Sequence, residues 1–96
     1  MKKDDCYNNG QKVSEQNGET LTYFYKSGAK KAEGKCINDQ FEGKWLFFGE
    51  DGEIIQEGNF KNNLKDGEWK RYNKTGELDY HEEFREGKKI KKPKPL

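Results

Sequence analysis

The side chains best suited to acid–base chemistry lie around His81, the only histidine of the chain. Asp79, Glu82 and Glu83 flank it within two positions. General acid–base catalysis needs such groups to converge on one substrate. On a strand, however, Glu82 and Glu83 point to opposite faces, and the same alternation places His81 on a charged, solvated face. We therefore expect an exposed histidine, no catalytic residue and a protein that is not an enzyme.

Neither a metal site nor a cofactor site is predicted. Cys6 and Cys36 lack the spacing of zinc ligands, and no glycine-rich loop opens onto a helix in the manner of a phosphate site. The two cysteines would pair in an oxidising compartment and stay reduced in a cytosol. Cys36 falls on a predicted strand, where we expect it to pack as a small apolar side chain.

Aromatic residues interleaved with basic ones can bind single-stranded nucleic acid by stacking, and residues 69–72 (Trp-Lys-Arg-Tyr) have this character. The matching segment 24 positions earlier, residues 45–48 (Trp-Leu-Phe-Phe), has no basic residue. A stacking platform should repeat its charge together with its rings. The comparison disfavours nucleic acid and favours aromatic residues that are buried or face a protein partner.

The composition is unusual for a folded protein: 29% of the 96 residues are hydrophobic and 39% are charged. Such a balance leans toward disorder, but 14% of the residues are aromatic and these recur at fixed spacing. The charge is also uneven, because residues 85–96 carry six basic residues and one acidic one. This segment is either a solvated terminus or a basic tail that contacts an anionic membrane or an acidic partner.

Glycines and aromatic residues recur with a period of 24 positions. The matched pairs are Gly43–Gly67, Trp45–Trp69, Phe48–Tyr72, Gly52–Gly76 and Phe60–Phe84. One period earlier lies a degraded copy, with Leu21 at the tryptophan position. We therefore predict an array of three copies (18–42, 43–66 and 67–89). A partial copy precedes it in residues 1–17, where segment 6–12 resembles the closing segment 84–89. A basic, proline-containing tail, 90–96, follows the array.

Each copy predicts one β-hairpin. Residues 44–48 form the outgoing strand, a polar loop ends in the turn-favouring pair Asp51-Gly52, and residues 53–60 return. The return strand alternates, with Ile54, Gln56, Gly58 and Phe60 on one face. Wider turns at Asn62-Asn63 and Asp66-Gly67 lead into the next copy. The predicted fold is all-β: consecutive antiparallel hairpins of about 24 residues that form one elongated, twisted sheet of six strands.

The outgoing strands carry more apolar surface than a hairpin needs. Trp45 and Phe48 are three positions apart, so either a bulge rotates one of them or they face different layers. Leu46 and Phe47 stand where the next copy has Lys70 and Arg71. Because contiguous exposed apolar area usually marks an interface, we expect a partner-binding or self-association surface there. The predicted partner-binding residues are Leu46, Phe47 and Arg71.

The motif Gly-x-Trp-x-x-Tyr/Phe, followed by Asn/Asp-x-x-Gly-x-Leu/Ile and a further aromatic residue, resembles the MORN-repeat variant of bacterial proteins. The resemblance is strongest in residues 43–89 and weaker in 18–42. It implies a repeat scaffold, one branch of which carries an antitoxin label. The scaffold positions that it implies are Gly43, Trp45, Phe48, Gly52, Phe60, Gly67, Trp69, Tyr72, Gly76 and Phe84.

These observations favour a non-catalytic protein-interaction scaffold, in one form an antitoxin or immunity-type protein. The alternative is a peripheral membrane-surface module that uses the basic tail. No run of 18 apolar residues is present, and the first residues lack the apolar segment of a signal peptide. As the sequence stands, it predicts a cytoplasmic protein; a signal peptide removed from the natural chain would make it an exported one.

Overall fold

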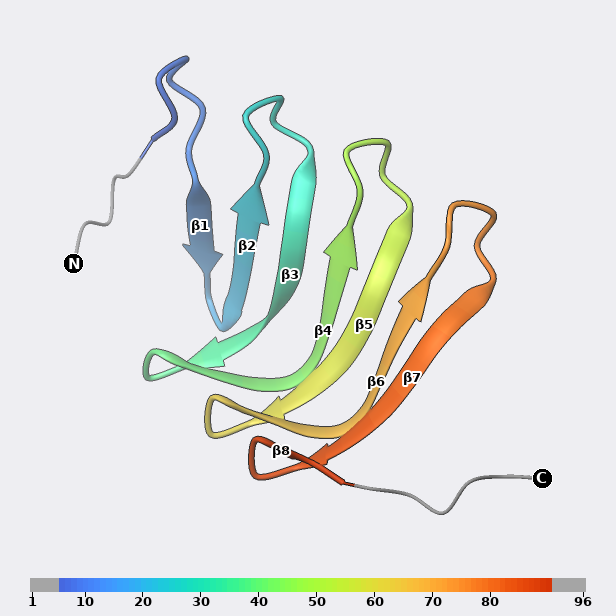
Figure 1. Cartoon of the computed structure of the whole chain (residues 1–96). Helices are drawn as coiled ribbons and strands as arrows, with labels where there is room; N and C mark the ends of the chain where they lie inside the picture. Colours follow the sequence, from blue (N-terminus) through green and yellow to red (C-terminus); the bar gives the residue numbers. More distant parts are fainter. Residues whose placement is uncertain (1–5, 91–96) are drawn as a thin grey trace.

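The computed structural model describes residues 6–90, which form a single sheet of eight antiparallel strands. Each strand pairs with the next one along the chain (Figure 1). The strands are β1 (Ser14–Asn17), β2 (Thr20–Phe24), β3 (Lys30–Ile37), β4 (Gln40–Phe48), β5 (Ile54–Lys61), β6 (Leu64–Tyr72), β7 (Leu78–Arg85) and β8 (Lys88–Lys89). The predicted all-β sheet of consecutive hairpins is confirmed. It has two strands more than the six expected, because short strands close both ends. Within residues 6–90 no helix is long and apolar enough to cross a membrane.

Two kinds of turn connect the strands. Three of the four lower turns place two successive residues at positive φ, as hairpins of type I′ require; these residues are Asn38-Asp39, Asn62-Asn63 and Glu86-Gly87. The fourth, between β1 and β2, has a positive φ at Gly18 alone. The three upper turns, at the top of Figure 1, span residues 25–29, 49–53 and 73–77. In each upper turn a glycine amide donates to the carbonyl three residues earlier: Gly28 to Tyr25, Gly52 to Gly49 and Gly76 to Asn73.

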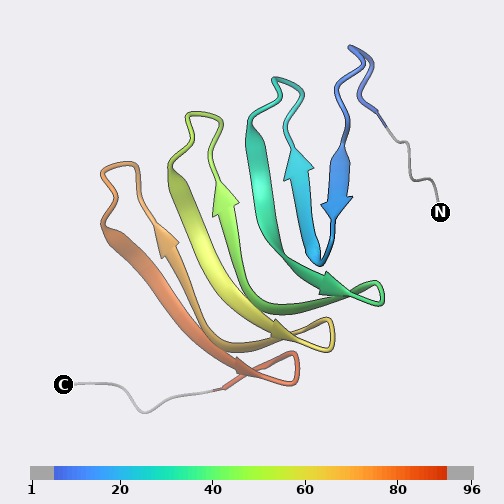
Figure 2. The ribbon, with the colours of Figure 1, turned by 180° about the vertical axis from the view of Figure 1, so that it is seen from behind.

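The expectation of wider lower turns was wrong. Asp66-Gly67, which has the composition of a turn, lies inside β6, and Glu42-Gly43 lies inside β4. Gly43 and Gly67 have φ values of 68° and 74°, and the register with the preceding strand shifts beside them. Extra residues on one strand of a pair bend that strand. The long strands consequently bend, and their lower ends swing to one side (Figures 1 and 2).

The aromatic rings gather on the inner side of this bend. Phe41, below the bend in β4, stacks on Trp45 above it, with ring centroids 4.2 Å apart. In the same way Phe60 contacts Trp69 edge to face, with centroids 5.1 Å apart. Rings from the two arms of a bent sheet can meet in this way only on its concave side. We call this side the inner face and the opposite side the outer face.

Each tryptophan packs against a glycine of the preceding strand. A Cβ atom on Gly34 would overlap the ring of Trp45, and one on Gly58 would overlap the ring of Trp69. The indole Nε1 of Trp45 donates to the Lys35 carbonyl at 3.0 Å, and that of Trp69 donates to the Asn59 carbonyl at 2.9 Å. The glycines therefore let the indoles lie directly on the backbone, where their N–H groups find acceptors. Trp45 is fully buried and Trp69 is 4% exposed.

The two cysteines are not joined by a disulfide. Cys36 is buried beside Phe41, its register partner, whereas Cys6 is exposed. Burial, together with the nearby Asp39 carboxylate, raises the pKa of the Cys36 thiol. Packing of Cys36 as a small apolar side chain is thus confirmed.

Iodoacetamide at pH 8 should therefore label Cys6 in the native protein and reach Cys36 only after unfolding. A raised thiol pKa lowers the reactive thiolate fraction, and burial blocks access. Mass spectrometry of the labelled tryptic peptides, with and without urea, measures both sites. Labelling of Cys36 at equal rates in both conditions would contradict its buried position.

Segment 6–12 forms a turn of the upper kind. The Tyr7 amide donates to the Gln11 carbonyl, and the Gly10 amide donates to the Tyr7 carbonyl. This is the hydrogen-bond pattern of residues 25–29, and the segment lies beside the upper turns in Figure 1. The prediction that segment 6–12 corresponds to the closing segment 84–89 was wrong, because residues 84–89 contain a lower turn, at Glu86-Gly87. Polar residues followed by a glycine occur in both kinds of turn region, so composition alone does not distinguish them.

Candidate interaction face

The inner face presents an ordered row of side chains above the bend. Successive register partners across six strands contribute one residue each: Tyr23, Ala32, Phe47, Gln56, Arg71 and Tyr80. Direct partners in an antiparallel pair place their side chains next to one another on the same face. The row therefore begins with aromatic and aliphatic residues on β2 to β4 and ends with a cation and a phenol on β6 and β7.

The end of this row on β6 and β7 is its most exposed part. The Arg71 guanidinium lies over the ring of Tyr80, with Cζ 4.8 Å from the ring centroid. Tyr80 is 43% exposed, and Arg71 is also exposed. Phe47 is half-buried, because its ring contacts that of Trp69 with centroids 5.9 Å apart. The half-buried Phe47 ring and the exposed Arg71–Tyr80 cation–π pair thus lie in one row, with Gln56 between them.

Below the bend a second row alternates rings with cations. The ammonium of Lys65 lies 4.7 Å from the ring centroids of both Trp69 and Phe84. Lys65 stands 24 positions after Phe41, so a cation covers Trp69 where a stacked ring covers Trp45. Lys89 follows by the same interval and pairs with Phe84 across the last hairpin. The inner face therefore becomes basic toward β8.

Glu82 on β7 occupies the position that a glycine occupies on β3 (Gly34) and β5 (Gly58). It stands 24 positions after Gly58, where a third glycine would be expected. Its carboxylate is 2.7 Å from the Lys89 ammonium and accepts a hydrogen bond from the Tyr80 hydroxyl. The contact with Lys89, followed by that with Tyr80, lowers the pKa of Glu82. A carboxylate in this position excludes a further indole and holds Tyr80 at the rim of the face.

The three residues expected to bind a partner are only partly brought together. Phe47 and Arg71 lie in the same row, separated by Gln56. Leu46 lies on the outer face, between its register partners Glu33 and Glu57. Adjacent residues of a strand point to opposite faces, so Leu46 and Phe47 cannot form one patch. Both are also half-buried, which corrects the expectation that they are exposed.

The residues assigned to the scaffold occupy turns, bends and packed rings. Gly43 and Gly67 lie at the bends, and Gly52 and Gly76 lie in upper turns at positive φ. Trp45, Phe60, Trp69 and Phe84 form one chain of ring contacts on the inner face. Phe48 and Tyr72, at the ends of β4 and β6, pair with Ile54 and Leu78 beside register shifts.

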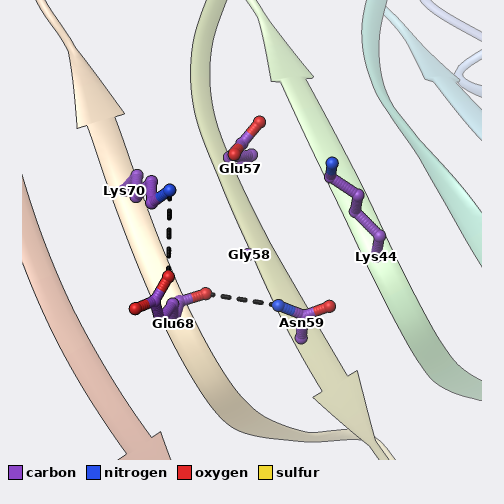
Figure 3. Close-up of a pocket in the computed structure, with 6 residues that line it drawn as sticks. All are labelled: Lys44, Glu57, Gly58, Asn59, Glu68 and Lys70. Carbon is purple, nitrogen blue, oxygen red and sulfur yellow. Dashed lines mark hydrogen bonds and ion pairs between the residues drawn. The ribbon is translucent and has the colours of Figure 1, made fainter. Parts of the chain in front are cut away.

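The outer face carries a shallow, charged depression of about 250 Å³ where the sheet bends (Figure 3). It is lined by Lys44, Glu57, Gly58, Asn59, Glu68 and Lys70. The Lys70 ammonium is 3.8 Å from a Glu68 carboxylate oxygen, and the Asn59 amide donates to the Glu68 backbone carbonyl at 3.4 Å. Two lysines and two glutamates balance one another in this open hollow. The arrangement offers neither a net charge for an ion nor an enclosed space for a substrate.

His81 lies on the outer face, as its alternation predicts, with Nε2 3.4 Å from a Glu68 carboxylate oxygen. About a third of its side chain is exposed, at 36%, and Glu68 is more open still. Asp79 and Glu83 lie two positions from His81 on β7 and share its face, whereas Glu82 faces the inner side with Tyr80 and Lys89. Among residues 6–90, no three His, Cys, Asp or Glu side chains lie close enough together to hold a metal ion.

The spacing between tryptophan and glycine was the signal that sequence reasoning missed. Gly34 precedes Trp45 by eleven positions, and Gly58 precedes Trp69 by the same interval. A second missed signal is a tyrosine three positions before the turn glycine, at Tyr7 and Tyr25. The Tyr7 hydroxyl donates to the Phe24 carbonyl, and the Tyr25 hydroxyl donates to the Phe48 carbonyl.

Most of the basic tail, residues 91–96, lies outside the described residues, so the proposed role of the tail at a membrane has no structural counterpart here.

The chain was compared with models of protein families, with curated proteins and with solved structures, and no match was found.

Proposed function

We propose that this chain is a non-catalytic protein-interaction scaffold built of MORN-variant repeats, and that it binds its partner on the inner face of the sheet. The observation that carries the proposal is the row in which Phe47, Gln56, Arg71 and Tyr80 stand side by side on β4 to β7. Among residues 6–90 no second layer of the chain lies over this row, because the described chain is one layer of strands.

The chemistry of this row suits a protein surface. Tyrosine and arginine are the residues that, with tryptophan, most often carry the binding energy of protein interfaces. Tyr80 and Arg71 already hold each other in a stacked geometry, so little side-chain freedom remains to be lost on binding. Lys65 and Lys89 make the lower part of the same face basic. We therefore propose a partner segment that combines apolar and acidic side chains.

Replacing Arg71 with glutamate should weaken binding of the partner at least about tenfold, because it removes the cation–π pair and reverses the charge of the row. Lys70→Glu is the matched control: it makes the same charge change on the neighbouring residue, which faces outward. A protein captured stoichiometrically from the source organism by the unaltered chain, and titrated against each variant, provides the measurement.

Loss of binding in both variants, or in neither, would contradict the placement on the inner face. Circular dichroism of the two variants verifies that the sheet is retained. An antitoxin or immunity protein is one form of the proposed scaffold, because residues 43–89 resemble a repeat family of which one branch carries an antitoxin label. Its captured partner would arrest growth when expressed alone, and co-expression of this chain would restore growth. A captured partner without toxicity would refute this form while leaving the scaffold proposal intact.

A further inference from the structure

An open groove lies between the last two upper turns, away from the inner face. Its volume is about 650 Å³, within the range of about 300–1,000 Å³ that small-ligand sites occupy. One wall is the turn between β4 and β5, and the other is the end of β6 with the residues that follow it (Figure 1). The lining residues are Gly49, Glu50, Asp51, Glu53, Ile55, Tyr72, Asn73 and Lys74.

The corresponding space between the two preceding turns is filled by a tyrosine. Tyr25 is the first residue of its turn, and its hydroxyl donates to the carbonyl of Phe48, the last residue of β4, at 2.6 Å. Tyr7 does the same one turn earlier, with its hydroxyl 2.7 Å from the Phe24 carbonyl. In both places a tyrosine side chain reaches from an upper turn to the end of a strand in the next hairpin. This contact closes the gap between the two neighbouring hairpins.

At the next position the chain has a glycine. Gly49 begins its turn as Tyr25 does, with the same two backbone hydrogen bonds: its amide donates to Glu53 and its carbonyl accepts from Gly52. Tyr72 stands where Phe48 stands, and Asn73 stands where Gly49 stands, each 24 positions later. The backbone of the tyrosine site is thus retained, whereas the tyrosine side chain is missing. The groove is the space that this side chain would occupy.

The walls of the groove differ from those around Tyr25 in a way that defines its occupant. The Lys31 ammonium lies 5.7 Å from the centroid of the Tyr25 ring, but the corresponding residue in the groove is Ile55, which is 40% exposed. An apolar wall therefore replaces a cationic one. The rim of the groove has three carboxylates, Glu50, Asp51 and Glu53, against one cation, Lys74.

We propose that this groove binds a tyrosine side chain of a partner protein, with basic residues next to that tyrosine in the partner's sequence. The phenol ring lies against Ile55, and its hydroxyl donates to the Tyr72 carbonyl, as Tyr25 donates to Phe48. The flanking lysines or arginines meet the carboxylates of the rim. This site is separate from the inner face, so a failure of this proposal would leave the proposed partner binding on the inner face unaffected, and the reverse.

The test uses the full chain labelled with ¹⁵N and the capped peptide Lys-Tyr-Lys as the probe. Titration should shift the amide resonances of Gly49, Ile55 and Tyr72 together. Lys-Phe-Lys, which lacks the hydroxyl, should bind several-fold more weakly, because a lost hydrogen bond costs about 0.5–1.5 kcal/mol. Lys-Ala-Lys, with the same charge and no ring, should leave these resonances unshifted. Equal shifts with all three peptides would overturn the proposal, since charge alone would then explain them.

Gly49→Tyr should fill the groove from within the chain and reduce binding of the probe at least about tenfold. The only atom closer than 3.5 Å to a Cβ at Gly49 is Oδ1 of the Asp51 side chain, at 3.0 Å. This oxygen accepts a hydrogen bond from the Glu53 amide at 3.1 Å, and it needs to shift by only a few tenths of an ångström. Ile55→Lys serves as a second variant: it restores the cation found at Lys31, and so repels the basic probe without filling the groove. Unchanged binding in both folded variants, or loss of binding in Arg71→Glu, would place the probe elsewhere and refute the site.

Discussion

Replacing Gly58 with alanine should lower the free energy of unfolding by about 3 kcal/mol, although the change adds only one methyl group. That methyl would overlap Cδ2, Cε2 and Cε3 of Trp69. The indole has little room to retreat, because its Nε1 is bonded to the Asn59 carbonyl and its ring lies edge to face against Phe60. Since small domains are stable by only about 5–15 kcal/mol, a loss of this size should be plain in urea denaturation followed by tryptophan fluorescence.

Gly49→Ala is the matched control for this experiment. It makes the same chemical change in an upper turn of the same protein. A Cβ there would be 3.0 Å from Asp51 Oδ1, the end of a side chain that can shift slightly, and at ordinary distances from everything else. We expect its effect to stay within about 1 kcal/mol. Gly34→Ala, which faces Trp45 as Gly58 faces Trp69, should behave like Gly58→Ala. Equal effects of Gly58→Ala and Gly49→Ala would mean that the indoles do not depend on the glycines.

The course of the strands was predictable because it depends on local signals. The return strands alternate in residue type, and turn glycines such as Gly52 and Gly76 indicate positive φ by their place at the end of short polar loops. The bends were not predictable in this way. Asp66-Gly67 has the composition of a turn, yet it lies within β6, because the preceding pair Asn62-Asn63 already provides the type I′ turn. Two turn-like pairs so close together give one turn and one bulge, and only the pairing of the strands decides which is which.

The candidate site was harder to predict, because it depends on contacts between strands. Along β4 alone, Leu46 and Phe47 form one apolar pair; in the sheet they belong to different faces with different neighbours. Arg71 stands out in the sequence because it replaces Phe47 in the next copy, but its partner Tyr80 is not evident from that comparison. Tyr80 becomes its neighbour only through the register of β6 with β7. The groove at Gly49 was missed for the same reason: the absence of a tyrosine is informative only once Tyr25 is seen to reach Phe48.

Replacing Trp45 with alanine should have the largest effect of any single truncation in this chain, a loss of about 3–5 kcal/mol in the free energy of unfolding. Trp45 is the only fully buried large side chain among residues 6–90. Its ring stacks on Phe41 and lies against Phe60, with centroids 4.2 and 6.1 Å apart. Because the described sheet has no second layer, no other side chain can move in from above to fill the space. The cavity should therefore remain open to water and leave both rings exposed.

Two further variants complete the comparison, one that separates the Trp45 ring from its hydrogen bond and one that removes an exposed ring. Trp45→Phe keeps an aromatic ring over Gly34 but leaves the Lys35 carbonyl without the indole N–H, so we expect a smaller loss of about 1–3 kcal/mol. Tyr80→Ala removes a ring that is 43% exposed and should cost about 1 kcal/mol or less. Fluorescence of Trp69, which all three variants retain, reports unfolding in each of them. Equal losses for Trp45→Ala and Tyr80→Ala would show that stability is spread evenly over the hairpins. The expected order instead places the stability of the sheet in the indole at the bend, so that Arg71 and Tyr80 could serve the proposed binding without being needed for stability.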